Sequence, residues 1–479
     1  MSSAWLAPIF SSRPSAPSTY TAVIALIGQS NMVGRLGPID GVLDSSQSDI
    51  LMYSAGSLVT ATHPLDHFDE TPDTVGPGLE LAKQYLSNNA DCDRVVLVPA
   101  ADGGTGHLAL NWNRLDPVYT DAVARVDDAV NLATSAYGAI ELSIAHIQGE
   151  DDIDGSSGIP ATDDEMQSMK AKLCIDFRED VVGATQDTPI AFGGLPPNWT
   201  GGTGLAAINT MYGQLGSFVN NYSYADPSVP TVLPSADTDN IHYTAASSRD
   251  MGVRLANAID AAKNASVTLP TYPTPPAGTY GFYYDVTGVA DGHAIKELSA
   301  DVKNTVRRCY ISGGNMRFGG PTGTVSRRIH MLRDGFTPLT NQDFSLRLAL
   351  TPDTNSGNEG LVGIWVTSGN RRSWLLRRNA TSLEFFISSN GSTSTSISAS
   401  GAISAGVETL VEVTRTGSNI EMFVDGVSAG TATFSGSAYD DGDNDLGVTI
   451  GDFDNLYQGG NLSSRTYFGQ MRYVILEYT

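Results

Sequence analysis

Short, nearly continuous runs of apolar residues alternate with helix-like segments in the first half of this chain, and this alternation limits the fold more than any other feature. Strands that are apolar on both faces are typical of a parallel sheet covered by helices on each side. Thr162 and Glu165 form a capping-box pattern that predicts a helix reaching about Val182, and another helix is predicted over Met251–Ala262. The sequence therefore predicts a doubly wound α/β domain with a parallel sheet. The apolar runs are Val23–Ile27, Arg94–Val98, Glu141–Ala145 and Pro189–Phe192.

The second half has the pattern of a β-sandwich. Apolar and polar residues alternate with period two in 344–350 and 419–424, and Asp425-Gly426 is a strong hairpin signal. A proline-rich stretch, 269–278, lies between the two halves and is typical of an extended spacer. The predicted organisation is an N-terminal tether (1–19), an α/β domain (20–265), a linker (266–280) and an all-β jelly-roll sandwich (281–479).

Acidic residues strongly outnumber basic ones. The chain has 52 Asp and Glu against 28 Lys and Arg, a formal charge of −24. A field of this sign repels phosphate backbones, so nucleic acid is not an expected partner. Residues 1–280 hold 32 of the acidic and 12 of the basic residues, so the two halves differ in composition as two domains do.

The cysteines and the hydropathy exclude several classes of protein. Cys92, Cys174 and Cys309 have no CxxC spacing, so we expect buried thiols rather than a disulfide framework or a zinc site. No run of about 18 apolar residues is present, and the first residues lack a charged segment followed by an apolar one. We therefore expect neither a membrane span nor a standard signal peptide.

Polar clusters follow the predicted strands of the α/β domain. Gly28–Met32 comes directly after the first strand and would expose the hydroxyl of Ser30 at the carboxyl edge of the sheet, where open α/β folds place their ligands. An ordinary serine-rich turn is the alternative. The glycine-rich Pro99–Gly106 follows the second strand, Gln148–Glu150 follows the third, and Asp239–His242 precedes the last helix. Four such clusters at one edge favour a catalytic site.

Asp239 and His242 are separated by three residues, a spacing that has a chemical use. The carboxylate can accept a hydrogen bond from one imidazole nitrogen while the other nitrogen faces Ser30. His242 would then be a general base. A solvated histidine at the start of an amphipathic helix is the alternative.

These motifs together resemble the SGNH hydrolases, in particular the sialate O-acetylesterase-like and carbohydrate esterase family six branch. The resemblance rests on Gly28–Met32, Gly103–Thr105, Gln148–Glu150 and the Asp239/His242 pair, which occur in the family's order within about residues 20–263. It implies a three-layer α/β/α, flavodoxin-like fold. It also implies metal-independent removal of O-acetyl groups from carbohydrates, so neither a cofactor nor a catalytic metal is expected.

The resemblance assigns a role to each motif residue. Ser30 would be the nucleophile, His242 the base and Asp239 the acid that orients it. The backbone N–H groups of Ser30 and Gly104 and the side chain of Gln148 would form the oxyanion hole. Gln148 stands where many SGNH enzymes have asparagine. Glu150 is a second candidate acid, and which carboxylate matters more stays open.

The C-terminal half resembles concanavalin A-like domains of the laminin-G type, chiefly through Asn419–Gly426. Such domains often bind glycans, and Trp365, Trp374 and Tyr457 are candidates to stack on sugar rings, with core packing as the alternative for at least two of them. Asp440–Asp445 has carboxylates of the kind that bind calcium, and an acidic surface loop is the alternative.

An esterase joined to a lectin-like domain resembles the receptor-processing tail fibres and spikes of bacteriophages. This resemblance implies an O-acetylated bacterial surface polysaccharide as substrate, an extracellular or virion location with attachment to a phage tail, and a homo-oligomer, with a trimer as the expected state. One alternative is a non-catalytic glycan-binding adhesin or tail structural protein. Another is a secreted acetylxylan or sialate O-acetylesterase.

Overall fold

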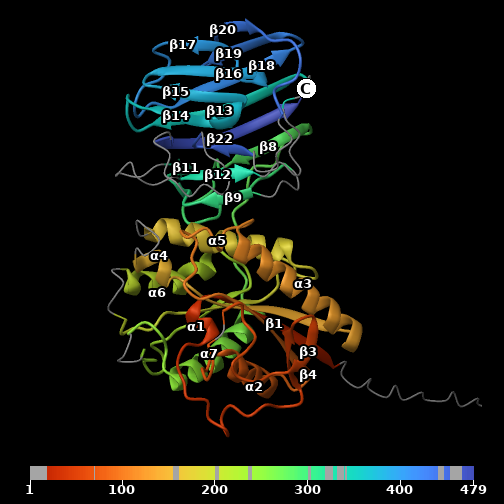
Figure 1. The fold of residues 1–479 in the computed structure, drawn as a ribbon. Coiled ribbons are helices and arrows are strands. Elements are labelled where there is room, and N and C mark those ends of the chain that lie inside the picture. The colour runs from red at the N-terminus through yellow and green to blue at the C-terminus, as the bar shows by residue number, and fades with distance from the viewer. Residues whose placement is uncertain are drawn as a thin grey trace, which may run out of the picture.

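The computed structural model has two domains stacked on one another (Figure 1). It describes residues 19–69, 71–154, 161–199, 204–235, 240–299, 304–318, 327–331, 339, 342–440, 447–453 and 466–478. All but the last residue of the predicted tether, 1–19, lies outside these ranges.

The N-terminal domain is built on a sheet with the strand order β3-β2-β4-β1-β5-β6-β7. Neighbouring strands pair in parallel except β2 and β3. The four predicted apolar runs lie in β1, β4, β5 and β6, whereas the short β2, β3 and β7 were not predicted. The strands are β1 (Tyr20–Gly28), β2 (Ile50–Ser54), β3 (Ser57–Thr60), β4 (Cys92–Ala101), β5 (Ile140–Ile147), β6 (Ile190–Gly193) and β7 (Tyr222–Ala225).

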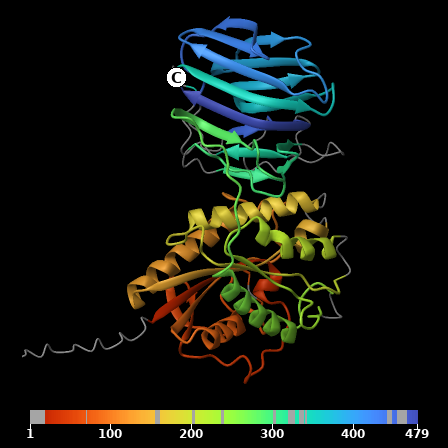
Figure 2. The ribbon, with the colours of Figure 1, turned by 180° about the vertical axis from the view of Figure 1, so that it is seen from behind.

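Helices cover both faces of this sheet and complete three layers (Figures 1 and 2). Helices α2 and α7 pack together on one face, and α3 lies on the other face, beside α5. The predicted capping box is confirmed: the Thr162 hydroxyl accepts from the Glu165 N–H, and Glu165 accepts from the Thr162 N–H. The helices are α1 (Ser30–Val33), α2 (Gly78–Asn88), α3 (Pro117–Tyr137), α4 (Glu150–Asp154), α5 (Asp163–Asp180), α6 (Leu205–Gln214) and α7 (Ala245–Ala262).

The C-terminal domain is a sandwich of two antiparallel sheets, as predicted. One sheet has the order β10-β11-β22-β13-β18-β19-β20, with β8 also paired to β22, and the other has the order β17-β16-β15-β14-β21-β12-β9. The first sheet contains β8 (Thr279–Asp285), β10 (Tyr310–Ser312), β11 (Asn315–Phe318), β13 (Phe344–Pro352), β18 (Thr409–Thr416), β19 (Asn419–Val424), β20 (Val427–Thr433) and β22 (Gly469–Tyr478). The second contains β9 (Asn304–Arg307), β12 (Arg328–Met331), β14 (Asn358–Val366), β15 (Arg371–Asn379), β16 (Ser382–Gly391), β17 (Thr395–Ala399) and β21 (Val448–Ile450).

The predicted hairpin and the candidate sugar-stacking residues belong to this domain. The hairpin between β19 and β20 is confirmed, and Asp425 and Gly426 both have positive φ angles, as a two-residue hairpin turn of this kind requires. Trp374 is fully buried in the sandwich core, so it is not available to stack on a sugar. Tyr457 and most of Asp440–Asp445 lie outside the described residues.

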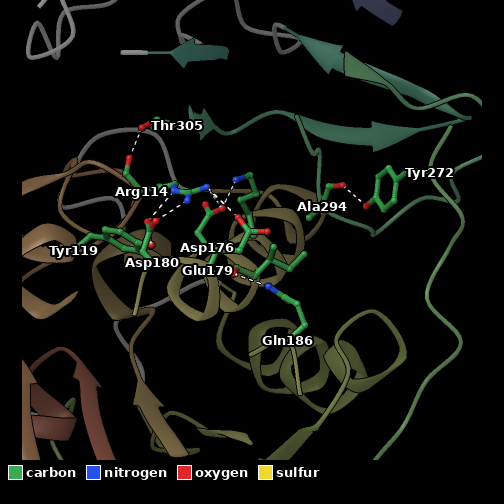
Figure 3. Close-up of polar contacts among 11 residues, drawn as sticks. Arg114, Tyr119, Asp176, Glu179, Asp180, Gln186, Tyr272, Ala294 and Thr305 are labelled. Atoms are coloured by element: carbon green, nitrogen blue, oxygen red, sulfur yellow. Dashed lines mark hydrogen bonds and ion pairs between the residues drawn. The ribbon is translucent and has the colours of Figure 1, made fainter. Parts of the chain in front are cut away.

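Buried ion pairs join the two domains. Arg307 at the end of β9 donates to Asp116 at 3.0 Å, and their side chains are 7% and 1% exposed. The hydroxyl of Thr305 donates to the carbonyl oxygen of Arg114, whose guanidinium in turn binds acidic residues of α5 (Figure 3). These contacts join β9 of the C-terminal domain to the segment before α3, and that segment to α5. The C-terminal domain is therefore fixed against the helix layer that contains α3 and α5.

The cysteines are buried free thiols, as the sequence analysis expected. Burial raises the pKa of the Cys174 thiol to about 12 and also raises the pKa of Cys92 and Cys309, so all three stay protonated at neutral pH. Across the described parts of the chain, we find no helix with the length and apolar character needed to cross a membrane.

Candidate active site

The carboxyl ends of β1, β4 and β5 meet at one edge of the sheet and place the motif residues together. Gly28, the last residue of β1, is in register with the last residues of both neighbouring strands. It has a φ of +129°, and a Cβ atom there would lie 2.0 Å from the carbonyl oxygen of Ile147. Only glycine fits this turn, which leads the chain from β1 into α1 and places Ser30 at the start of that helix.

Ser30 and His242 are in direct contact. Nε2 of His242 lies 2.9 Å from Oγ of Ser30, and Ser30 is 5% exposed. His242 lies just before α7, whose first turn is capped by the side chain of Thr244. The structure therefore brings together the hydroxyl and the imidazole in the arrangement of a nucleophile and its base.

Asn31 holds the backbone on both sides of His242. Its Nδ2 donates to the carbonyl oxygen of Ile241 at 3.1 Å, and its Oδ1 accepts from the N–H of Tyr243 at 2.9 Å. Nδ2 also donates to Oε1 of Glu150. Asn31 belongs to the Gly28–Met32 motif, but no role was predicted for it, and its position beside Ser30 is the one sequence signal that points to it.

Glu150, the second candidate acid, begins α4 and is 1% exposed. Burial raises the pKa of this carboxyl to about 7, against the opposing effect of the hydrogen bond from Asn31. Its Oε2 has no hydrogen-bond partner within the described residues. Glu150 is thus connected through Asn31 to the backbone on both sides of His242. Asp239 lies outside the described residues, and its predicted role stays a prediction.

The glycine-rich loop after β4 leaves open space at Gly104. This residue has a φ of +67°, is exposed, and a Cβ atom there would meet nothing within 4 Å. The next residue anchors the loop, because the hydroxyl of Thr105 donates to the carbonyl of Asp102 at 2.6 Å and accepts from Nε1 of Trp112 at 2.9 Å. The backbone at Gly104 is therefore held in place with room for a ligand beside it.

Gln148 lies fully buried behind this loop. Its Nε2 donates to Oδ2 of Asp152 at 2.7 Å and lies 3.4 Å from the carbonyl oxygen of Thr105. Its Oε1 accepts from Nζ of Lys170 on α5. Asp152 also accepts from the N–H of Leu108, so it connects Gln148 to the chain just after the glycine-rich loop. Neither Lys170 nor Asp152 was predicted from the sequence as part of the site.

No cluster of three or more His, Cys, Asp or Glu side chains that could hold a metal ion occurs among the residues that the structure describes. The contact between Ser30 and His242 supports proton transfer between the hydroxyl and the imidazole.

Comparison with solved structures returns receptor-binding domains of toxins at low similarity. The binding domain of Paraclostridial Mosquitocidal Protein 1 is 12% identical, with a TM-score of 0.33, over 42% of this chain and 48% of that one. The binding domain of botulinum neurotoxin serotype D is 9% identical, with a TM-score of 0.31, over 42% of this chain and 47% of that one. This chain therefore covers about half the length of each, and similarities this low carry no functional argument. No curated protein sequence matches the chain.

Two family models match the chain, one in each domain. Residues 330–464 match the concanavalin A-like lectin/glucanases superfamily. Residues 20–261, about half of the chain and including both Ser30 and His242, match the carbohydrate esterases described as sialic acid-specific acetylesterases. The protein therefore belongs to this family of carbohydrate esterases.

Proposed function

We propose that this protein is a carbohydrate O-acetylesterase with Ser30 as its nucleophile and His242 as its general base. The observation that carries the proposal is the 2.9 Å separation between Oγ of Ser30 and Nε2 of His242. A serine hydroxyl is a weak nucleophile at neutral pH and becomes effective when an imidazole within hydrogen-bond distance takes its proton. Membership of a carbohydrate esterase family supports an acetylated sugar as the substrate.

The reaction proceeds in two steps. In the first, Oγ of Ser30 attacks the acetyl carbonyl carbon while Nε2 of His242 takes the hydroxyl proton. The tetrahedral intermediate then expels the sugar alcohol, which receives that proton from His242, and leaves acetyl-Ser30. In the second step, His242 takes a proton from water as the water attacks the acetyl group. This proton passes to Oγ of Ser30 as the acetyl group leaves as acetic acid, which then ionises to acetate.

The backbone N–H groups of Ser30 and Gly104 and the amide of Gln148 stabilise the oxyanion of both intermediates. Support for this assignment comes from the open space beside Gly104 and from the direction of the Gln148 amide, whose Nε2 faces Thr105 in the same loop. Fixed donors aimed at the developing charge need no rearrangement during the reaction, which is why such donors contribute strongly to catalysis.

Asp239 orients the imidazole of His242, as the resemblance implies, and Glu150 supports the same residue from the other side through Asn31. The contact between Asn31 and Glu150 supports the second part of this assignment. Because burial raises the pKa of Glu150 to about 7, this side chain carries a proton over much of the acid range and is less suited than Asp239 to be the permanent anion.

The C-terminal domain binds the glycan that the catalytic domain deacetylates. Its match to concanavalin A-like lectins supports this role, and so does the position of Trp365. Trp365 is partly exposed on the face of β14 opposite the core, and its ring lies 5.6 Å from that of Phe386. Arg377 lies over Phe386 at 4.7 Å. An aromatic pair with a cationic neighbour on a sheet face suits a sugar ring.

We extend the proposal to the setting of the reaction. The substrate is an O-acetylated bacterial surface polysaccharide, and the protein acts outside the bacterial cell as an oligomeric part of a phage tail fibre or spike. The combination of an esterase domain and a lectin-like domain in one chain supports this extension. Light scattering of the purified protein tests the oligomeric part, and a stable monomer would contradict it.

The central experiment measures acetate release from an aryl acetate and from three classes of acetylated glycan: bacterial surface polysaccharide, xylan and sialic acid. We expect wild type to hydrolyse the aryl ester and one glycan class, and Ser30→Ala to hydrolyse neither. Ser143→Ala, the same change at a buried serine in β5, is the matched control and should stay active. Wild-type turnover in Ser30→Ala would overturn the mechanism, whereas glycan binding without turnover in wild type would favour the adhesin alternative.

A further inference from the structure

Lys170 is a fully buried lysine that the proposed reaction does not use. It lies in the middle of α5, and its Nζ donates to Oε1 of Gln148 and lies 3.2 Å from Nε2 of His146. Lysine is almost never fully buried unless it is paired, because its ammonium group loses its hydration there. Burial lowers the pKa of Lys170 to about 8, which leaves the group mostly protonated at neutral pH.

The ammonium group of Lys170 determines which way the amide of Gln148 points. A lysine ammonium has three donors and no acceptor, so the atom of Gln148 that faces it must be the carbonyl oxygen. The amide nitrogen then points to the other side, where it donates to Oδ2 of Asp152 at 2.7 Å. The flipped amide would place an N–H group against the ammonium and an oxygen against the carboxylate of Asp152. Both contacts would be repulsive, so a single orientation is favoured.

This orientation directs the amide nitrogen to the glycine-rich loop. Nε2 of Gln148 lies 3.4 Å from the carbonyl oxygen of Thr105, the residue after Gly104, and 3.4 Å from Oε1 of Gln29, the residue before Ser30. Asp152 takes one hydrogen of the amide, and the second hydrogen faces Thr105 and Gln29 through two hydrogen bonds that are long and therefore weak.

We propose that Lys170 is a positioning residue, which fixes the amide of Gln148 so that an N–H group faces the oxyanion of the acyl-transfer intermediates. The inference rests on the proposed function, because the orientation of Gln148 matters only if its N–H group stabilises that oxyanion. The contacts of Nζ are with Gln148 and His146 rather than with Ser30 or His242, so Lys170 acts through Gln148.

A double-mutant cycle on the full-length protein tests this role, with aryl acetate hydrolysis as the readout. We expect Gln148→Ala to lower kcat by about 10²–10³, the usual effect of losing one oxyanion donor. Lys170→Met should cause a loss of the same order or smaller, with KM little changed. In the Gln148→Ala background, Lys170→Met should cause no further loss. If the two losses multiply instead, Lys170 does not act through Gln148 and the proposal is wrong.

Lys172→Met is the matched control, because Lys172 is a second buried lysine on the same helix that pairs with Asp176. We expect it to lower the melting temperature and leave kcat unchanged. An equal loss of kcat in Lys172→Met and Lys170→Met would attribute the effect to a loosened α5 and would overturn the proposal. If Lys170→Met does not fold, the same cycle is run with Lys170→Gln, whose amide is one bond shorter and leaves no donor at the position of Nζ.

Three further outcomes distinguish the failure of this proposal from the failure of the proposed function. If wild type hydrolyses no acetyl ester, the proposed function fails, and the role of Lys170 fails with it. If wild type is active and Lys170→Met keeps full kcat, only the role of Lys170 is overturned. A shift in the pH dependence of kcat/KM without a loss of maximal kcat would indicate that Lys170 serves as a counter-charge to Glu150 and Asp152, and this too would contradict the proposal.

Discussion

Asn31 donates a hydrogen bond to the buried carboxylate of Glu150 and at the same time holds the chain on both sides of His242. It accepts from the N–H of the residue after the histidine at 2.9 Å and donates to the carbonyl oxygen of the residue before it at 3.1 Å. Because Asn31 directly follows Ser30 in α1, one short segment carries the proposed nucleophile and also holds the backbone around the proposed base, His242.

We predict that Asn31→Ala lowers kcat by about 10²-fold, the effect expected when catalytic groups move by about 1 Å. The backbone around His242 loses two hydrogen bonds in this variant, and the distance between Ser30 and His242 is no longer fixed. KM for an aryl acetate should change little, because Asn31 contacts Glu150 and the backbone around His242 and is not expected to contact the substrate. Steady-state kinetics on the purified variant provide the measurement.

Asn89→Ala is the control for this prediction. Asn89 also anchors backbone with its side chain amide, donating to the carbonyl oxygen of Tyr85 at 2.9 Å, but it precedes β4 and so lies at the opposite edge of the sheet. The Asn89→Ala variant should be less stable than wild type and should have the kcat of wild type. A variant of Asn31 with the kcat of wild type would show that the histidine loop holds its position without this side chain.

Glu150→Gln should make the protein more stable than wild type at neutral and alkaline pH. The pKa of Glu150 is raised from 4.5 to about 7 by burial, so the folded state binds a proton here that the unfolded state has already released between these pH values. The stability of wild type therefore falls as the pH rises from 4.5 to about 7, and glutamine removes this loss. Denaturant unfolding at a series of pH values measures the difference, which should grow with pH and level off above about 7.

Glu165→Gln should show the opposite dependence on pH. Burial by itself would raise the pKa of Glu165, but the guanidinium groups of Arg308 and Arg327 lower it below its ordinary value. This carboxylate thus stabilises the folded protein at neutral pH and ceases to do so as the pH falls through its lowered pKa. Parallel pH curves for the two variants would contradict both assignments.

The sequence predicted the elements whose apolar pattern is strong, together with the edge of the sheet where the site lies. Strands β1, β4, β5 and β6 are buried on both faces, so their apolar runs are nearly continuous. Strands β3 and β7 are short and mixed in composition because they lie at the edges of the sheet, and β2, next to β3, is apolar but only five residues long. Predicting a strand from the periodicity of its apolar residues needs a longer and more regular pattern than these strands have.

The role of α5 could not be predicted from its sequence. Lys170 and Lys172 are two positions apart and therefore lie on different faces of the helix. Lys170 donates a hydrogen bond to Gln148, whereas Lys172 pairs with Asp176. Helical periodicity normally separates a buried face from a solvated face, but α5 lies between the catalytic sheet and the second domain and is buried on both sides. Charged residues on such a helix give no signal of which one reaches the site.

Arg307→Met should strongly destabilise the protein, because it removes a buried ion-pair partner of Asp116. Breaking a buried pair in this way costs about 3–5 kcal/mol, since the remaining charge stays desolvated. Asp116 also accepts a hydrogen bond from Nδ2 of Asn113, which lies in the segment that follows Gly104. We therefore expect kcat to fall together with stability. Denaturant unfolding and aryl acetate kinetics measure the two effects.

Arg317→Met is the matched control for the interface. Arg317 pairs with Asp353 on the surface of the sandwich, where the side chains are 24% and 35% exposed. A pair of this kind contributes about 0–1 kcal/mol, so the variant should be close to wild type. Equal stability losses in the two arginine variants would mean that the contact between the domains adds nothing beyond an ordinary surface pair.

Trp365→Ala should weaken glycan binding by a few-fold to about tenfold, because an aromatic ring contact contributes about 0.5–1.5 kcal/mol. Binding is measured by calorimetry in the Ser30→Ala background, with the polysaccharide that wild type deacetylates, so that the ligand stays intact. Turnover of an aryl acetate by Trp365→Ala with Ser30 intact should equal that of wild type, because Trp365 lies in the other domain. Tyr280→Ala, at a partly exposed aromatic residue of the opposite sheet, should bind normally. Full binding by Trp365→Ala, or a larger loss in Tyr280→Ala, would place the glycan elsewhere on the sandwich.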